Sequence, residues 1–124
     1  MEFYALANSN LDVAQLQREL AIARLPQLCA SIDRVLADHG DHGEIYCLWG
    51  QFRVNREDIR DGVRFSLPAC PNALAWTVAL AREAGRSGVL VHCTINRRSH
   101  EKDFVDSIAT FVEDWRHGIE ALAG

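Results

Sequence analysis

The sequence predicts an α+β domain, in which a small mixed or antiparallel sheet of three or four strands carries helices packed on one face. Three observations predict this class. Two alternating runs, 45–54 and 63–67, are typical of a β-hairpin. A third run, 89–95, is rich in valine, and residues 104–122 place apolar side chains at helical spacing. A single domain spanning residues 1–124 accommodates all of these elements.

Two helices are predicted before the hairpin. Ser9 or Asn10 suits the N-cap of a first helix that runs to about Arg24. Pro26 suits the first turn of a second helix, whose apolar stripe ends at Gly40. If residues 2–7 also form a strand, the order becomes βαββαβ with a long C-terminal helix added, which is the ferredoxin-like arrangement.

Further elements are predicted after the hairpin. Cys70-Pro71 begins a helix that directs Leu74 and Val78 inward and stops at glycines 85 and 88. The strand at 89–95 then returns parallel by a right-handed crossover. The final helix has the clearest apolar stripe, made of Phe104, Ile108, Phe111, Val112, Trp115, Ile119 and Leu122.

Composition restricts the class of protein. The net charge of -4 argues against bulk binding of nucleic acid. No stretch approaches ~18 apolar residues, and the N-terminus lacks the pattern of a signal peptide, so we expect a cytoplasmic protein that does not bind membranes. The four cysteines form no Cys-x-x-Cys pair, and no cofactor signature is present, so we expect reduced, packed thiols and no cofactor.

The alternation in the hairpin sorts its side chains onto two faces. One face is a predicted core made of Tyr46, Leu48, Phe52, Val54, Val63, Phe65 and Leu67. The second face carries Cys47 and the predicted ligand-binding residues Trp49, Gln51, Arg53, Arg64 and Ser66, with His92 added from the third strand unless its register places Cys93 there instead. We expect Arg53 and Arg64 to converge on a carboxylate or phosphate, and Trp49 to form an apolar wall.

Three weaker candidates lie elsewhere. His39, Asp41 and His42 are ligand types that divalent metals prefer, although turn chemistry accounts for all three, and we predict no metal site. Cys70, at a predicted helix start, is a candidate nucleophile that would need His92 as its base. The basic run 96–102 opens the last helix and either binds an anion or is a solvated cap.

These features favour a binding or interaction module that uses the open sheet face for a small anionic or aromatic ligand or a protein partner. One alternative is a small enzyme in which His92 and Cys70 act on an anionic substrate. A structural subunit of a larger assembly is the other alternative. A homodimer formed through the sheet face or the C-terminal helix is also expected, because an open sheet face is often covered by a second copy.

Overall fold

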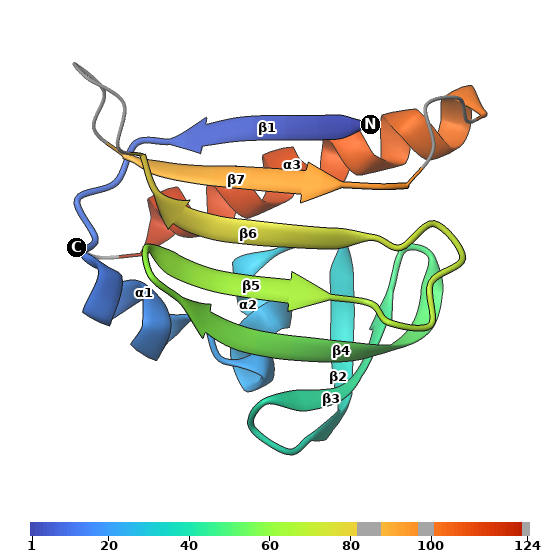
Figure 1. Ribbon diagram of the computed structural model, residues 1–124, viewed down its shortest axis with the longest axis horizontal. Helices are drawn as coiled ribbons and strands as arrows, with labels where there is room; N and C mark the ends of the chain where they lie inside the picture. Colours follow the sequence, from blue (N-terminus) through green and yellow to red (C-terminus); the bar gives the residue numbers. More distant parts are fainter. Residues whose placement is uncertain (82–87, 97–100, 123–124) are drawn as a thin grey trace.

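One antiparallel sheet of seven strands dominates the computed structural model, which describes residues 1–81, 88–96 and 101–122 (Figure 1). The first half of the chain forms β1 (Glu2–Ala7), α1 (Val13–Glu19), the 3-10 helix η1 (Ile22–Arg24), α2 (Leu25–Leu28), β2 (Ile32–Asp38) and β3 (His42–Cys47). The second half forms β4 (Gly50–Ile59), β5 (Gly62–Ser66), β6 (Ala75–Leu80), β7 (Val89–Thr94) and α3 (Lys102–Ala121). In Figure 1, α2 and α3 lie behind the sheet and α1 lies beside the ends of β4 and β5. None of the described helices is long and apolar enough to cross a membrane.

The strands follow the order β1-β7-β6-β5-β4-β3-β2, and every neighbouring pair is antiparallel. From β2 to β7 each strand pairs with the next along the chain, and β1 is added beside β7. The predicted sheet of three or four strands is therefore wrong, and so are the ferredoxin-like order and the parallel return of residues 89–95. The error arose because two segments that we interpreted as helices are strands, and because the run 45–54 contains two strands instead of one.

The first of these segments is β2, where two β-bulges imitate a helical pattern. Its pairing with β3 is irregular between Ile32 and Arg34, and again between Val35 and Ala37. Each bulge adds one residue and shifts the in-out alternation. As a result, Ile32 and Val35, three residues apart, both face the core. An apolar spacing of three is typical of a helix, so the strand could not be recognised from its periodicity.

The second segment is β6, which we predicted as the helix starting at Cys70-Pro71. Leu74 and Val78 are both buried, and their spacing of four residues fits a helix and a strand equally well. Trp76 lies between them and is also buried, which fits only the period of a strand. Residues 82–87, the rest of the predicted helix, lie outside the described residues.

The run 45–54 contains a turn that we did not predict. Cys47 pairs with Gly50 across a two-residue turn at Leu48 and Trp49, and Gly50 has a φ of +115°, which favours glycine. The predicted single strand is therefore two strands. The turn also reverses the facing of residues before it, so that Cys47 is buried whereas Tyr46 and Leu48 are exposed.

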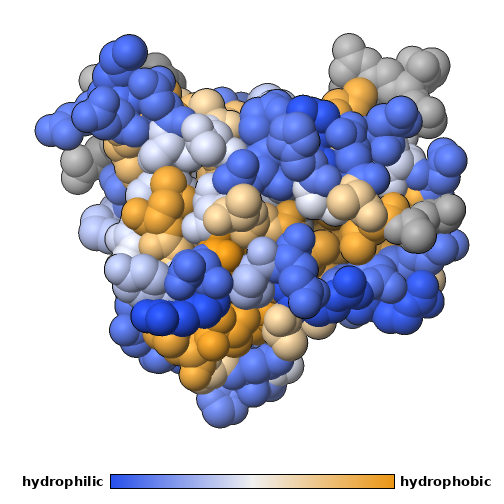
Figure 2. Space-filling model, turned by 180° about the vertical axis from the view of Figure 1, so that it is seen from behind, coloured by the Kyte–Doolittle hydropathy of each residue, from blue (hydrophilic) through white to orange (hydrophobic). Residues whose placement is uncertain are grey.

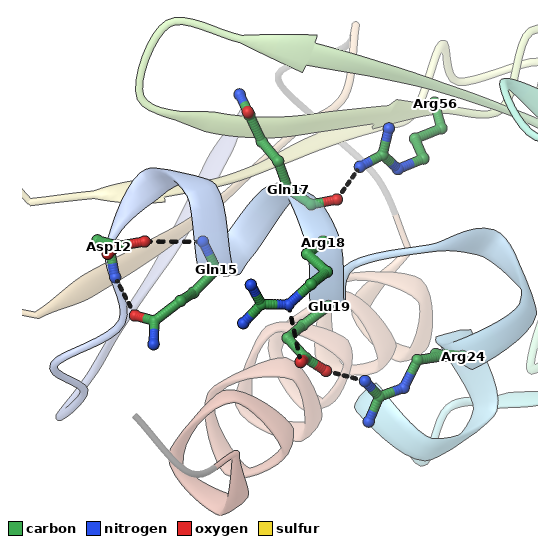
Figure 3. Close-up of polar contacts among 7 residues, drawn as sticks. All are labelled: Asp12, Gln15, Gln17, Arg18, Glu19, Arg24 and Arg56. Atoms are coloured by element: carbon green, nitrogen blue, oxygen red, sulfur yellow. Dashed lines mark hydrogen bonds and ion pairs between the residues drawn. The ribbon is translucent and has the colours of Figure 1, made fainter.

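Other sequence predictions are confirmed. Residues 2–7 form β1, the run at 89–95 forms β7, and the long C-terminal helix is α3. The first helix exists but is shorter than predicted, and its N-cap is Asp12. Asp12 and Gln15 form a capping box in which each side chain accepts a hydrogen bond of 2.8 Å from the other's backbone N–H (Figure 3).

The core lies between the sheet and α3, and aromatic side chains fill its centre. Phe65 and Trp76 from neighbouring strands stack with ring centroids 5.3 Å apart. From α3, Phe111 meets the Trp76 ring edge-on at 4.9 Å, and Trp115 lies 5.7 Å from Phe65. The indole N–H groups of Trp76 and Trp115 find no partner among the described residues, so packing rather than hydrogen bonding stabilises this cluster.

Polar contacts attach α1 to the sheet. Arg56 of β4 points to the helical side and donates hydrogen bonds of 2.7 Å to the backbone carbonyls of Leu20 and Gln17, which satisfies the C-terminal end of α1. Figure 3 shows the bond to Gln17. In return, the Gln17 amide donates to the carbonyls of Ile59 and Gly62, which flank the β4–β5 turn. These hydrogen bonds therefore hold α1 and the β4–β5 hairpin in a defined position relative to each other.

The aromatic core gives a first prediction. Phe111→Ala should lower the free energy of unfolding by about 3–5 kcal/mol, because the ring is buried and its removal leaves a cavity. Urea denaturation followed by circular dichroism measures this. Thr110→Ala, at the exposed neighbouring position, should stay within about 0.5 kcal/mol of the wild type. A loss below about 1 kcal/mol for Phe111→Ala would contradict the core assignment.

The contact between Arg56 and α1 gives a second prediction. Arg56→Met should lower the free energy of unfolding by about 1.5–3 kcal/mol, because it leaves two carbonyls at the end of α1 without their charged donor. Arg56→Lys should not restore stability, since one ammonium group cannot match the two donors of the guanidinium fork. Arg53→Met, at an exposed position of the same strand, is the control. Equal stability of the two Met variants would contradict a stabilising contact between Arg56 and α1.

Candidate functional site

The face of the sheet opposite the helices is turned towards the viewer in Figure 1, and we call it the open face. The antiparallel registers align these residues into rows that cross the strands. One row crosses five strands and consists of Tyr4, His92, Thr77, Arg64 and Glu57. The next row consists of Glu2, Thr94, Ala75, Ser66 and Asn55. Five separate segments of the chain therefore contribute to one surface.

The middle of the open face carries small side chains, so its surface is recessed there. A hollow of about 200 Å³ there is lined by Arg64, Ala75, Trp76, Thr77, His92 and Thr94, and we call it the trough. Because Trp76 directs its ring into the core, its contribution to the trough is backbone. A second hollow of about 210 Å³ lies on the other side of Arg64 and includes Glu57 and Ser66. Arg64 is thus the residue that both hollows share.

Two carboxylates hold the basic groups of the trough. Glu57 Oε1 accepts a hydrogen bond from Arg64 Nη1 at 3.1 Å, directly across the β4–β5 pair. At the opposite end, Glu2 Oε1 lies 2.9 Å from His92 Nε2. The side chains of both pairs are partly exposed to solvent, so each contact contributes little to stability.

Tyr4 adds a flat wall beside His92. The two rings stack nearly parallel, with centroids 4.4 Å apart and an angle of 1° between their planes. Loss of solvent around the phenol, together with the nearby Glu2 carboxylate, raises the pKa of Tyr4. Tyr4 lies on the far side of His92 from the trough, and it supports the His92 ring by stacking on it.

The structure brings together only some of the residues that we predicted for this face. Arg64, Ser66 and His92 lie on the open face around the two hollows. Gln51 and Arg53 also point outward but lie further along β4, where Gln51 contacts Glu44 and Arg53 contacts Asn55. Arg53 pairs in register with Glu44, whereas Arg64 pairs with Glu57, four residues away on β4. At about 3.4 Å per residue the two arginines do not converge.

Trp49 does not lie on the open face. Its indole Nε1 donates a hydrogen bond of 2.9 Å to Ser107 of α3, and its ring lies 5.0 Å from that of Phe111. The turn at residues 48 and 49 explains this placement, because it ends the alternation that we extended from Gln51 back to Trp49. Trp49 thus contributes to the seating of α3 beneath the sheet.

Sequence reasoning missed the middle of the trough. Thr77 was hidden because its segment was interpreted as a helix, although Ala75, Thr77 and Ala79 alternate with apolar residues. Tyr4 and Glu2 were missed because we assigned no role to the outward side chains of residues 2–7. The alternation of both strands was the signal that could have found them.

The histidines of the β2–β3 hairpin lie at its tip, away from the trough. His42 Nδ1 is 2.7 Å from Asp41 Oδ1, and the rings of His39 and His42 stack with centroids 4.9 Å apart. The hydrogen bond from His42 lowers the pKa of Asp41. His39 and His42 border a hollow that also includes Glu44 and Arg53. Within the described ranges, no group of three or more His, Cys, Asp and Glu residues could hold a metal ion.

Cys70 lies in the loop between β5 and β6, where no helix begins, so the predicted activation by a helix start does not apply. Its side chain packs against the core, whereas His92 points to the open face. Cys70 and His92 therefore lie on opposite sides of the sheet and do not form a nucleophile–base pair. Of the basic run at 96–102, residues 97–100 lie outside the described residues, and the N-cap of α3 is Glu101.

The thiols give a third prediction. Burial raises the pKa of Cys29 and Cys93 to about 12 and also raises that of Cys47. The reactive thiolate is therefore scarce at these three sites at pH 8, whereas Cys70 is half-buried. Ellman's reagent should label one thiol rapidly per native chain and four in urea. Cys70→Ser should abolish the rapid phase, and two or more rapidly labelled thiols would contradict the packing described.

Comparisons with known proteins show a shared fold. No protein-family model matches the chain, and no curated protein matches it either. The chain is similar to the crystal structure of an uncharacterized protein from Bacillus thuringiensis, with a TM-score of 0.61 and 14% sequence identity. The match covers 96% of this chain and 97% of the other. At this identity the likeness establishes the fold and leaves the chemistry to be argued from the open face.

Proposed function

We propose that this protein is a binding module whose open face takes a small anion in the trough. One observation carries the proposal. Donor side chains from three neighbouring strands, Arg64 of β5, Thr77 of β6 and His92 of β7, line a single hollow with a floor of small residues. A rigid sheet holds these groups in register, so a ligand would find them already oriented.

Arg64 is the expected anchor. Its guanidinium offers a planar fork of donors that matches a carboxylate or a phosphate. The present partner of Arg64, Glu57, is a carboxylate on an exposed ion pair, and such pairs contribute little net free energy. An incoming anion can therefore replace this contact at low cost. The hydroxyls of Thr77 and Thr94 supply further donors to the same ligand.

The Tyr4–His92 stack favours an anion that carries a flat apolar group. His92 closes one end of the trough with Tyr4 stacked behind it, and the face of the His92 ring that is turned to the trough can pack against a ring of the ligand. An aromatic carboxylate combines both features, since its charge would bind Arg64 while its ring rests against His92. We therefore expect benzoate to bind more tightly than acetate.

Titration of the labelled protein with benzoate, acetate and inorganic phosphate, followed by amide shifts in NMR spectra, tests this function. The largest shifts should fall at Arg64, Thr77, His92 and Thr94. Arg64→Ala should weaken benzoate binding about tenfold or more, because it removes a charged, two-pronged contact. Arg53→Ala removes an equally outward arginine from another hollow and should change the affinity less than twofold.

Two results would overturn the proposal. In one, the shifts gather around His39, His42 and Arg53 instead of the trough. In the other, Arg64→Ala and Arg53→Ala bind benzoate equally well while both retain the circular dichroism spectrum of the wild type.

A further inference from the structure

The free edge of β1 presents unused backbone hydrogen-bonding groups. Met1 and Ile95 exchange two hydrogen bonds, from Met1 N to Ile95 O at 3.1 Å and from Ile95 N to Met1 O at 3.0 Å. In an antiparallel pair such exchanges recur at every second residue, so Phe3, Ala5 and Ala7 bond to β7. The N–H and C=O groups of the alternate residues Glu2, Tyr4 and Leu6 therefore point away from the sheet.

This free edge is short and well bounded. Beyond Leu6, the next outward N–H belongs to Asn8, and Glu120 of α3 already accepts its hydrogen bond at 2.8 Å. Among the described residues, the outward groups of Glu2, Tyr4 and Leu6 have no hydrogen-bond partner. The edge thus offers three donors and three acceptors in one straight row.

The two edges of the sheet differ in how they are protected. The β2 edge carries two bulges and the exposed charged residues Asp33, Arg34 and Asp38. Bulges and charges of this kind prevent edge-to-edge pairing. By contrast, β1 pairs with β7 in one unbroken register and has a single charged residue, Glu2, at its end. Among the residues that the structure describes, bulges and charges protect the β2 edge but not the β1 edge.

Half of the exposed large apolar side chains of the described residues lie at the same edge. Six large hydrophobic residues are exposed within the described ranges, and three of them, Met1, Tyr4 and Leu6, lie on or next to β1. The outer surface of α3 offers no comparable apolar stripe: the upper part of Figure 2, where α3 lies, is mainly hydrophilic. The β1 edge is therefore a better contact for a second copy than the C-terminal helix.

We infer that two copies of this chain pair through β1, antiparallel, about a two-fold axis at Tyr4. Tyr4 then faces Tyr4 of the second copy, and Glu2 faces Leu6 in both directions. This register is the one that joins all the outward groups of Glu2, Tyr4 and Leu6, since a shift by two residues leaves some of them unpaired. It also keeps the two Glu2 carboxylates apart and covers Leu6, so the edge is complementary to itself.

The proposed dimer is independent of the proposed anion site. Pairing at an edge leaves the open face uncovered, so the trough of each copy stays accessible. It brings the Tyr4–His92 ends of the two troughs next to each other across the two-fold axis. A dimer formed through the sheet face would instead cover the trough.

Light scattering coupled to size-exclusion chromatography tests this inference on the full chain. The wild type should elute at about 50 μM with twice the 13.9 kDa mass of one chain. Leu6→Glu should shift the protein to the monomer mass, because the new carboxylate would face Glu2 of the second copy. Leu6→Lys should stay dimeric, because an ammonium group there would face that same carboxylate.

Leu36→Glu is the matched control. Leu36 is 43% exposed and Leu6 is 40% exposed, but Leu36 lies on β2 at the opposite edge of the sheet. This variant should remain dimeric. A monomeric wild type would overturn the inference, and so would a dimer that survives Leu6→Glu or one that Leu36→Glu dissociates.

A second measurement keeps the test independent of charge effects. In the Cys70→Ser background, Tyr4→Cys should form a disulfide-linked dimer in oxidised glutathione, because residues facing each other in such a pair have Cα atoms about 5.5 Å apart. Leu36→Cys in the same background should stay mainly monomeric on a non-reducing gel. Equal cross-linking of the two variants would also overturn the inference.

Discussion

The seating of α3 on one face of the sheet is the interaction on which the rest of the structure depends. Phe111 and Trp115 of this helix pack onto Phe65 and Trp76 of the central strands, and that contact decides which side of every strand is buried. Because side chains alternate along a strand, burial of one set forces the other set outward. The open face, with its trough and its rows of polar residues, therefore exists because the opposite face is filled by the helix.

The sequence correctly predicted those elements whose apolar residues follow a single period, either that of a helix or that of a strand. The stripe of α3 and the alternation of β7 are undisturbed, and both were found. In β2 the bulges move apolar residues to a spacing of three, and in β6 the spacing of Leu74 and Val78 belongs to both periods. Once these two segments were interpreted as helices, the sheet lost its connection through β6 to β7. The predicted fold class was wrong because these two strands were missed. The true helices α1 and α3 had been predicted and did not cause the error.

Regular alternation also decided which residues of the candidate site could be predicted from the sequence. Arg64 and His92 were placed on one face because each lies in a run whose alternation is regular. Their closeness depends on Thr77 and its neighbours, which form the strand between them, and no local pattern reports which strands are neighbours. Trp49 was misplaced for the opposite reason, since a tight turn two residues long leaves almost no trace in hydrophobic periodicity.

The pairing of β1 with β7 joins segments almost a full chain length apart, and this has a consequence for folding. Tyr4 faces His92, so the first strand has no neighbour in the sheet until the last strand has been synthesised. During translation the β1 segment therefore lacks its partner strand, and its apolar side chains stay exposed while the strands from β2 to β7 are synthesised. Such distant pairing slows folding, so chaperone contact with the N-terminal segment would be most valuable during that interval.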